Sequence, residues 1–392
     1  MPRRSRMVHS IGGVAAALVI AGLACRGHAQ TDPARVQVRE GYAISVAVDE
    51  LPGARFLALD PDGTLYVSRP GPGDIVALRD ADGDGVYEQR TAFVEGHRTV
   101  HAMQWVEGWL WFTQTGAVLR ARDTDGDGAA DETVQVLGDE VLPADGSGHW
   151  WRSLLVHDGR IYTSIGDAGN IEDPGDSKRQ KIWSYALDGS DERLFASGLR
   201  NTEKLVVRPG TDEIWGMDHG SDWFGGVLER EADQGQPITD FNPPEEMNHY
   251  VQGGFYGHPF VVESRIVRYE FMNKPGIVEL AAKTTPPAWE GGAHWAANSM
   301  TFYAGDQFSG ARGDAFVAYH GSWNRSEPAG YCVARVLFDS GRPYGELVYA
   351  GFLTAEGEIL GRPVDTAVAP DGSLLISDDH GGRVYRMSYT GQ

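Results

Sequence analysis

The sequence predicts an all-β fold, a six-bladed β-propeller with four-stranded antiparallel blades, and three observations support this prediction. A phrase of apolar strand, Asp-Gly or similar turn, and second apolar strand occurs six times along the chain. Most copies recur near the period of roughly 40–50 residues that is typical of propeller blades. No segment beyond the N-terminus has a sustained helical period. Because a two-stranded unit cannot bury both faces by itself, the copies must pack on one another. They span residues 56–68, 102–113, 153–164, 204–217, 299–319 and 365–377.

Outer strands are expected after most of these hairpins, because alternating β-branched and aromatic residues follow them. The chain's 51 Gly and 20 Pro supply the turns. A strand from residues 42–48 is expected to complete the last blade and close the ring. Long insertions are expected after the fourth hairpin, at residues 223–298, and within the fifth. The expected outer strands are residues 74–79, 117–122, 181–187, 335–339 and 383–389.

The first 29 residues have the features of a secretory signal peptide, which leaves residues 30–392 as one propeller domain. Arginines near the start precede an apolar run from residue 11 to residue 24, which is short for a membrane span. Residues 27–29 (GHA) offer a cleavage site. Alternatively, the sequence around Cys25 partly resembles a lipoprotein processing site, so that Cys25 would carry a lipid anchor. Both interpretations predict an exported protein, periplasmic or secreted.

The amino-acid composition limits the kinds of molecule that this protein is expected to bind. The formal net charge of −21 disfavours nucleic acids and anionic membrane surfaces. Cys25 and Cys332 are the two cysteines, so removal of the signal would leave Cys332 without an internal disulfide partner. No Cys-x-x-Cys-His motif occurs, and a covalently attached haem is therefore not expected.

Two acidic loops share a pattern that is typical of calcium binding. Carboxylates at positions 1, 3, 5 and 9, with a backbone carbonyl at position 7, can surround one hard cation, and Gly at position 6 permits the sharp turn. The flanking segments are strands, so these loops are not EF-hands, and a structural role at the blade edges is expected. The alternative is a pair of solvated acidic turns. The ligand positions are Asp80, Asp82, Asp84, Val86 and Glu88 in one loop, and Asp123, Asp125, Asp127, Ala129 and Asp131 in the other.

Four further segments adjoin the repeated hairpins and are expected to meet at one mouth of the central channel. They are residues 146–152 (GSGHWWR), 198–204 (GLRNTEK), 217–222 (MDHGSD) and 361–365 (GRPVD). Cationic and hydrogen-bonding side chains gathered there would hold an anionic ligand, because Arg matches carboxylates in bidentate geometry. The candidates are His149, Arg200, Asn201, His219 and Arg362. Each could instead serve packing or loop structure.

The order of these motifs resembles that of soluble quinoprotein glucose dehydrogenases and the related aldose-sugar and sorbosone dehydrogenase-like proteins. The resemblance covers most of the mature chain, and its later motifs look most like the sorbosone-dehydrogenase-like branch. The matching pieces are His149, Leu199-Arg200-Asn201, His219-Gly220, residues 242–248 (NPPEEMN), residues 256–259 (YGHP), residues 320–325 (HGSWNR) and residues 361–365 (GRPVD).

This resemblance implies a sugar dehydrogenase that passes hydride from a hydroxyl-bearing carbon to pyrroloquinoline quinone (PQQ), with a calcium ion at the channel mouth and an external electron acceptor. His149 matches the general base, and Arg200, Asn201 and Arg362 match cofactor contacts. The backbone carbonyls of Gly220 and Ser221 match calcium ligands.

The chain departs from the family pattern at several positions. Thr202-Glu203-Lys204 stands where Pro-Gln-Gly is usual, Val364 replaces a second late arginine, and Ser221 replaces a proline. A lysine of the glucose enzymes falls near His320 or Gly321. Lys204 or Arg325 could replace the lost cations.

Two other functions remain open at this stage. One is a non-catalytic carbohydrate- or protein-binding calcium propeller, which the missing arginine favours. The other is a calcium-dependent hydrolase of the lactonase type, which needs carboxylate or Asn ligands converging on the channel. The mouth motifs offer mainly His, Arg and backbone groups, which argues against the hydrolase. Fold by itself does not decide among these functions.

Overall fold

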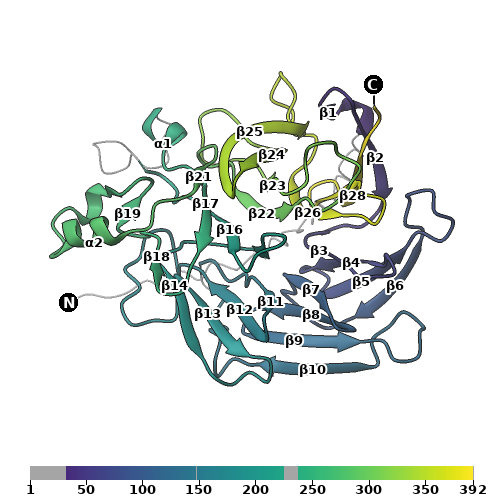
Figure 1. The fold of residues 1–392 in the computed structure, drawn as a ribbon, viewed down its shortest axis with the longest axis horizontal. Coiled ribbons are helices and arrows are strands. Elements are labelled where there is room, and N and C mark those ends of the chain that lie inside the picture. The colour runs from purple at the N-terminus through teal and green to yellow at the C-terminus, as the bar shows by residue number, and fades with distance from the viewer. Residues whose placement is uncertain (1–31, 147, 225–236, 392) are drawn as a thin grey trace, which may run out of the picture. The chain divides into compact units, whose positions relative to one another are not determined.

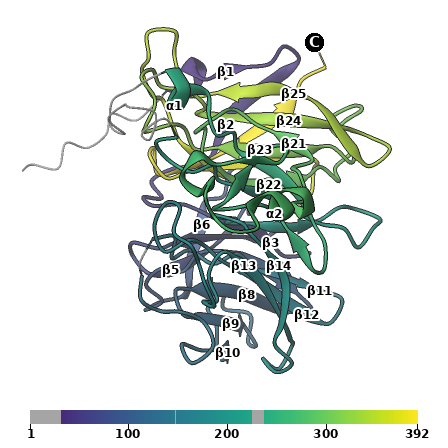
Figure 2. The same ribbon diagram turned by 90° about the vertical axis from the view of Figure 1, so that its left-hand side faces the viewer.

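The computed structural model describes residues 32–146, 148–224 and 237–391, which belong to one unit within Thr31–Gln392. Its six main sheets confirm the predicted six-bladed β-propeller. In chain order they run from the purple and blue sheets of the first blades to the yellow sheet of the last (Figure 1). Figure 2 shows the same sheets after a 90° turn, with blade five at the top and blade two at the bottom. The expected signal peptide, residues 1–29, and the candidate lipid anchor Cys25 lie outside the described residues.

Each repeated phrase forms the first two strands of a blade, as expected. Blade one contains β3 (Leu57–Leu59), β4 (Leu65–Arg69), β5 (Asp74–Arg79) and β6 (Gln89–Val94). Blade two contains β7 (Met103–Val106), β8 (Trp109–Gln114), β9 (Ala117–Arg122) and β10 (Glu132–Leu137). Blade three contains β11 (Leu155–His157), β12 (Arg160–Ile165), β13 (Lys181–Ala186), β14 (Arg193–Ser197) and β18 (Gly254–Phe255).

The second half of the ring follows the same plan. Blade four contains β15 (Leu205–Val207), β16 (Ile214–Asp218), β17 (Glu246–Tyr250) and β21 (Trp289–Glu290). Blade five contains β22 (Ala297–Phe302), β23 (Ala315–Tyr319), β24 (Cys332–Asp339), β25 (Arg342–Gly351) and β1 (Gln37–Val38). Blade six contains β26 (Pro363–Val368), β27 (Leu374–Asp378), β28 (Arg383–Tyr389) and β2 (Tyr42–Val48).

The first strands line the channel and contact one another in a closed ring, β3, β7, β11, β15, β22, β26 and again β3. The expected closure by residues 42–48 is confirmed, because β2 pairs antiparallel with β28 (Figure 1). Four blades have the expected four strands. Blades three and five each gain a fifth, because the unpaired outer edge of β14 accepts β18 in parallel and that of β25 accepts β1.

The expected insertion at residues 223–298 is only partly an insertion. β17 and β21 lie within it and complete blade four, so that expectation was wrong for these residues. The sequence of β17, EMNHY, does not alternate apolar and polar residues, and this hid the strand. The true excursion contains β18, the hairpin of β19 (Val261–Val262) and β20 (Ile266–Val267), and a helix, α2 (Ile277–Lys283).

Short helices also depart from the all-strand expectation. They are α1 (Pro237–Phe241), α2, and the 3₁₀ turns η1 (Pro33–Arg35) and η2 (Tyr269–Phe271). In α2, Ile277 and Ala281 lie four residues apart on one face and pack on Phe260 and Val261. Helices this short leave too little sequence for a periodic signal. Among the described residues, no helix has both the length and the apolar character needed to span a membrane.

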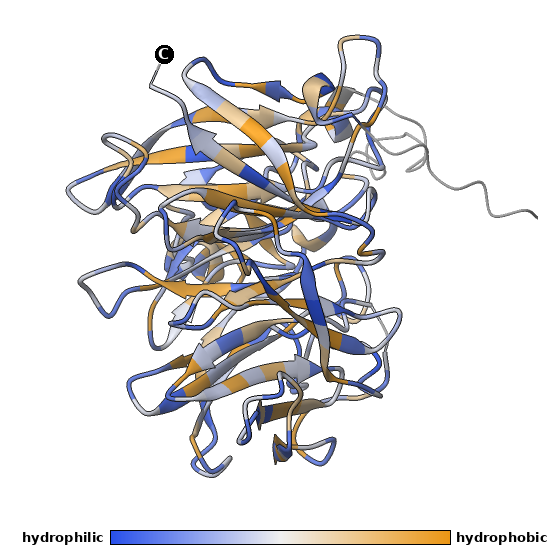
Figure 3. Cartoon of the chain, turned by 90° about the vertical axis from the view of Figure 1, so that its right-hand side faces the viewer, coloured by the Kyte–Doolittle hydropathy of each residue, from blue (hydrophilic) through white to orange (hydrophobic). Residues whose placement is uncertain are grey.

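The hydrophobic core lies between neighbouring blades. Tyr66 of blade one stacks on Trp105 of blade two, with ring centroids 5.4 Å apart. Trp111 of blade two packs in one cluster with Ile161 of blade three. These tryptophans therefore pack between adjacent blades. Figure 3 shows that apolar residues are found mainly in the strands and hydrophilic residues mainly in the loops.

Candidate active site

One mouth of the propeller carries the segments selected from the sequence. In every blade the first strand begins and the second strand ends at this mouth, because the two form an antiparallel hairpin. His149 lies shortly before β11, Arg200 before β15 and Arg362 before β26, whereas His219 follows β16. The repeat thus brings together groups that are far apart along the chain.

A cavity of about 110 Å³ opens at this mouth. Three of its lining residues, His149, Arg200 and Gly220, were predicted site residues, and His219 was a candidate. Four of the others lie in segments already selected from the sequence, at residues 217–222, 242–248 and 320–325, but no role had been assigned to them. These others are Asp222, Glu245, His294, Ala296, Trp323 and Asn324.

His149 is held as a neutral imidazole. Its Nδ1 lies 3.2 Å from the carbonyl oxygen of Asp167, which can only accept, so Nδ1 carries the proton and Nε2 keeps its lone pair. Burial, reinforced by the charge of Arg200, lowers the pKa of His149 to about 3. Gly166 permits the close approach, since a Cβ there would lie 2.7 Å from the Cβ of His149.

Asp167 anchors the loop of His149 to the excursion between β17 and β21 of blade four. Its carboxylate accepts hydrogen bonds from His258 Nε2 at 2.6 Å and from Gln180 Nε2 at 3.0 Å. These bonds, with the backbone N–H of Gly169 at 2.9 Å, outweigh burial and lower the pKa of Asp167 to about 2. A charged, fully bonded carboxylate therefore fixes the carbonyl that orients the imidazole.

Arg200 is buried and fully engaged. Its guanidinium pairs with Asp222 Oδ2 at 2.9 Å and donates to Asn170 Oδ1 and to the carbonyl of Gly220, both at 3.0 Å. The neighbouring Asn201 donates to Glu203 Oε1 at 3.1 Å, and its Nδ2 lies 3.2 Å from Nδ1 of His219. Arg200 and Asn201, two of the predicted cofactor contacts, thus lie at the mouth and form hydrogen bonds with the carboxylates of Asp222 and Glu203.

Acidic groups inside the cavity are the main addition made by the structure. Glu245 is buried, and its carboxylate accepts the backbone N–H groups of Ala296 and Ala297 at 3.1 and 3.2 Å. Burial raises the pKa of Glu245 to about 8. Asp222 accepts a hydrogen bond from Asn324 at 3.0 Å.

The three other predicted cation contacts lie outside the lining of this cavity. Arg362 donates to the carbonyls of His320 and Gly321 at 3.1 and 2.9 Å. Lys204 pairs with Asp365 at 2.6 Å and so joins blades four and six. Arg325 donates to the carbonyl of Ala293 at 3.2 Å and to that of Asp240.

A second polar cluster at the mouth surrounds Arg55. Its guanidinium pairs with Glu203 at 3.1 Å and with Asp379 at 2.8 Å. Burial opposes ionisation of Glu203, but Arg55 and the nearby His101 hold its pKa well below the usual range. Trp151 stacks on His101, with centroids 4.6 Å apart. His101 is buried in this cluster.

The predicted calcium carbonyls lie between two arginines. Gly220 accepts from Arg200, and the buried hydroxyl of Ser221 accepts from Arg268 at 2.5 Å. Gly220 also packs tightly, since a Cβ there would lie 2.7 Å from the carbonyl oxygen of Pro244.

Both acidic loops have the arrangement expected of cation loops. Carboxylate oxygens of positions 1, 3 and 9 lie within 4.8 Å of one another in each loop. The position-5 carboxylates, Asp84 and Asp127, instead accept the backbone N–H of position 7 at 2.8 Å. The two sets of three are Asp80, Asp82 and Glu88, and Asp123, Asp125 and Asp131.

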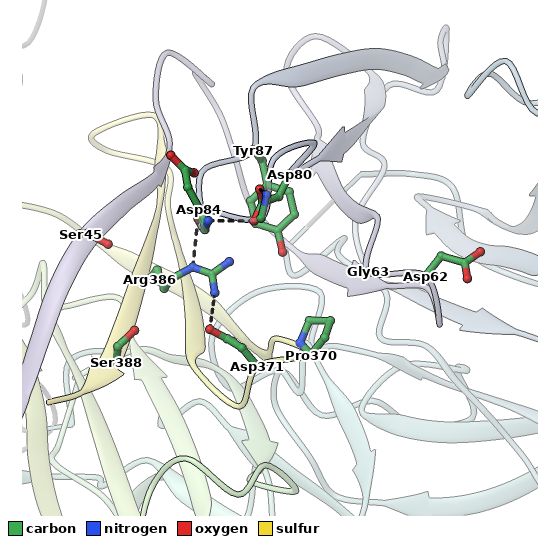
Figure 4. Close-up of a pocket in the computed structure, with 12 residues that line it drawn as sticks. Ser45, Asp62, Gly63, Asp80, Asp84, Tyr87, Pro370, Asp371, Arg386 and Ser388 are labelled. Carbon is green, nitrogen blue, oxygen red and sulfur yellow. Dashed lines mark hydrogen bonds and ion pairs between the residues drawn. The ribbon is translucent and has the colours of Figure 1, made fainter. Parts of the chain in front are cut away.

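These loops join the third and fourth strands of blades one and two, so they lie at the end of the propeller opposite the mouth. Each docks on the preceding blade: Tyr87 N–H donates to Ala47 at 2.8 Å, and Ala130 N–H donates to Phe93 at 2.9 Å. Arg386 of blade six donates to the carbonyl of Gly85 at 3.0 Å and to Asp371 at 2.8 Å (Figure 4). The first loop therefore spans the seam where the ring closes.

Comparison with known proteins places this propeller in a family. Residues 32–386 match the family model DUF7133, described as a domain of unknown function, and the chain belongs to that family. An uncharacterized protein of Borreliella burgdorferi is 33% identical over 236 residues, which are 59% of this chain and 57% of that protein. The match thus spans little more than half the length of this relative.

Solved structures with this fold include sugar dehydrogenases. The holo form of the PQQ domain of pyranose dehydrogenase from Coprinopsis cinerea has a TM-score of 0.74 and 19% identity, covering 90% of this chain and 97% of that one. The apo form of the soluble aldose sugar dehydrogenase from Escherichia coli has a TM-score of 0.63 and 17% identity, covering 89% and 99%. At these identities the similarity shows a shared fold.

Proposed function

We propose that this chain is an exported dehydrogenase that oxidises an aldose, or a related polyol or aldehyde, with PQQ and calcium and passes the electrons to an external acceptor. The observation that carries the proposal is His149, a neutral imidazole with a free Nε2 beside Arg200 in a cavity at the propeller mouth. The sequence resemblance and the sugar dehydrogenases of the same fold support it.

Arg200, Asn201 and Arg362 are donors of the kind that the carboxylates of PQQ would accept. To hold PQQ, Arg200 would exchange its pair with Asp222, and Arg362 its bonds to the carbonyls of His320 and Gly321, for the cofactor. The carbonyls of Gly220 and Ser221 would bind calcium once Arg200 no longer donates to Gly220. When bound, PQQ accepts the electrons and calcium polarises the quinone.

The chain's own residues supply the proton chemistry. His149 Nε2 would accept the proton of the substrate hydroxyl as hydride leaves the carbon that bears this hydroxyl. The carbonyl of Asp167 keeps Nδ1–H in place and stabilises the imidazolium that forms. Asp167 is fixed in turn by His258.

The decisive experiment is titration of the calcium-loaded apoprotein with PQQ, followed by dye reduction with a panel of aldoses. Saturable binding with sugar-dependent reduction supports the proposal. Absence of saturable binding at micromolar PQQ contradicts it.

A flat pH profile is expected for this enzyme. The base acts in its neutral form, which predominates above its pKa of about 3. The value of kcat/KM should therefore stay level between about pH 5 and 7, below the raised pKa of Glu245 in the same cavity, and fall on the acid side only as the pH drops towards the pKa of His149. Dye-reduction rates at constant ionic strength measure this profile. An acidic limb centred near the ordinary histidine value of about 6.5 would contradict the assigned environment.

Calcium in the two acidic loops is proposed to stabilise adjacent blades. An ion present at about 100 times its Kd adds about 2.7 kcal/mol per site to the unfolding free energy. Chelation with EDTA should therefore lower the thermal midpoint by several degrees, and calcium should restore it. The double substitution D80N/D82N should remove part of this response, whereas D176N in another exposed loop should not. Equal melting with EDTA and with calcium would contradict the proposal.

One observation favours a non-catalytic carbohydrate-binding propeller as a second candidate. Arg55, Arg200 and Lys204 each pair with a carboxylate, which leaves less positive charge for a tricarboxylate cofactor. The hydrolase alternative also gains support, because Asp222, Glu245 and Asn324 line the cavity. The PQQ titration separates the dehydrogenase from both, and a lactone hydrolysis assay with calcium separates these two.

A further inference from the structure

The rim of the cavity carries an exposed tryptophan that the proposed proton chemistry does not use. Trp323 lines the cavity and is 65% exposed. Its ring meets that of Trp223 edge to face, with centroids 5.2 Å apart. A large exposed aromatic side chain beside a polar cavity is a feature of binding surfaces.

The loop that carries Trp323 is firmly held, so the exposure does not result from a loose segment. Ser322 N–H donates to the carbonyl of Ala329, and the N–H of Ala329 donates to Ser322 Oγ, both at 2.9 Å. The hydroxyl of Tyr331 donates to the carbonyl of Ser322 at 2.5 Å. The aromatic face is therefore presented to solvent by a structured turn.

Next to this face lies a hydrogen-bond acceptor that has no donor among the described residues. Asn324 is 2% exposed, and its Oδ1 forms no hydrogen bond with any described residue. Its amide nitrogen donates to Asp222 Oδ1 at 3.0 Å, which fixes the orientation of the side chain. An unpaired buried acceptor is unfavourable, so a ligand hydroxyl that donates to it is favoured.

The charges of the cavity favour a neutral ligand. Arg200 and Asp222 form an ion pair at 2.9 Å, and His149 is uncharged. A neutral ligand that has both an apolar ring face and hydroxyl donors is a sugar. The axial C–H groups of a pyranose pack on aromatic rings, while its equatorial hydroxyls reach polar groups.

We propose that Trp323, Asn324 and Asp222 form a pyranose subsite. The C–H face of a neutral pyranose stacks on Trp323, and adjacent hydroxyls donate to Asn324 Oδ1 and to the carboxylate of Asp222. The role of this subsite as a substrate site rests on the proposed function, since it would present the sugar to His149. Binding itself is a property of the apoprotein and requires no cofactor.

The test is calorimetric titration of the cofactor-free full chain with D-glucose, D-galactose and D-xylose, using glycerol as a small polyol control. Saturable binding of at least one pyranose, stronger than that of glycerol, is expected. W323A should weaken it about tenfold, and W323F should stay within about threefold of the wild type. N324A should also weaken it. Y344A, which removes an exposed aromatic residue on the outer strand β25, should leave it unchanged.

Absence of pyranose binding, or equal affinity in W323A and the wild type, would overturn the subsite. Circular dichroism spectra and melting curves of each variant exclude misfolding, and the W323F comparison keeps the test informative if W323A is unstable. Failure of PQQ binding with intact, Trp323-dependent sugar binding would instead reject the dehydrogenase and leave the subsite standing.

Discussion

Replacing His149 with glutamine should lower kcat for PQQ-dependent sugar oxidation by about 10²–10⁴-fold, the range expected for loss of a general base. The amide can occupy the imidazole's place and still meet the carbonyl of Asp167, but it cannot take up a proton at the position of Nε2. The Kd for PQQ should change little, because Arg200 and Arg362 remain. Stopped-flow reduction of the bound quinone by sugar measures the chemical step directly.

His157 provides a matched control for this substitution. It lies at the end of β11 and contacts Asp212 at 3.2 Å, on the same blade as His149 but away from the cavity. H157Q should leave the reduction rate within about twofold of the wild type, because the half-buried His157 lies outside the lining of the cavity. A His149→Gln enzyme with nearly full activity would assign the base to another group, with Glu245 as the next residue to test.

Replacing Arg152 with methionine should lower the free energy of unfolding by about 4 kcal/mol or more. Arg152 is 0% exposed, and its guanidinium satisfies the carbonyls of His149, Trp150, Trp151 and Pro143 at 2.7–3.3 Å. Methionine fills the volume but leaves these carbonyls without a donor, and each such loss costs about 1–3 kcal/mol. Urea titration followed by fluorescence measures the change as a shift in midpoint at constant m.

The loop that carries His149 should also lose order in this variant, so kcat should fall while the fold persists at low temperature. Arg160→Met is the control, because Arg160 pairs with Asp191 at 2.8 Å at the surface. Exposed pairs contribute about 0–1 kcal/mol. Equal destabilisation by the two substitutions would show that Arg152 has no special role in holding the loop.

The sequence determined the propeller because its repeat encodes the local hairpins directly. Strand alternation and Asp-Gly turns specify β3–β4 and β26–β27 within a dozen residues, and this local signal extends to the closing strand β2. The same reasoning missed β17, whose residues Asn248 and His249 interrupt the apolar alternation. It also missed α2, which is too short to show a period.

The residues of the candidate site also divide into those that could be selected from the sequence and those whose contacts only the structure shows. The residues that adjoin each hairpin, His149, Arg200, Asn201 and Arg362, could be selected from the sequence because the propeller brings such positions to one mouth. Their contacts could not. Asp222, Glu245 and Asn324 lie within selected segments, but their hydrogen bonds join separate loops. The pairing of Lys204 with Asp365 likewise joins residues from different blades.

Sequence therefore determined the architecture, because it follows from short-range patterns, whereas His149 as the base was an expectation from the family resemblance and stays a proposal. The tertiary structure decided the protonation of His149, the pairing of the arginines and the polar rim beside Trp323. These depend on burial and on distances between loops of different blades, which arise only when the ring closes.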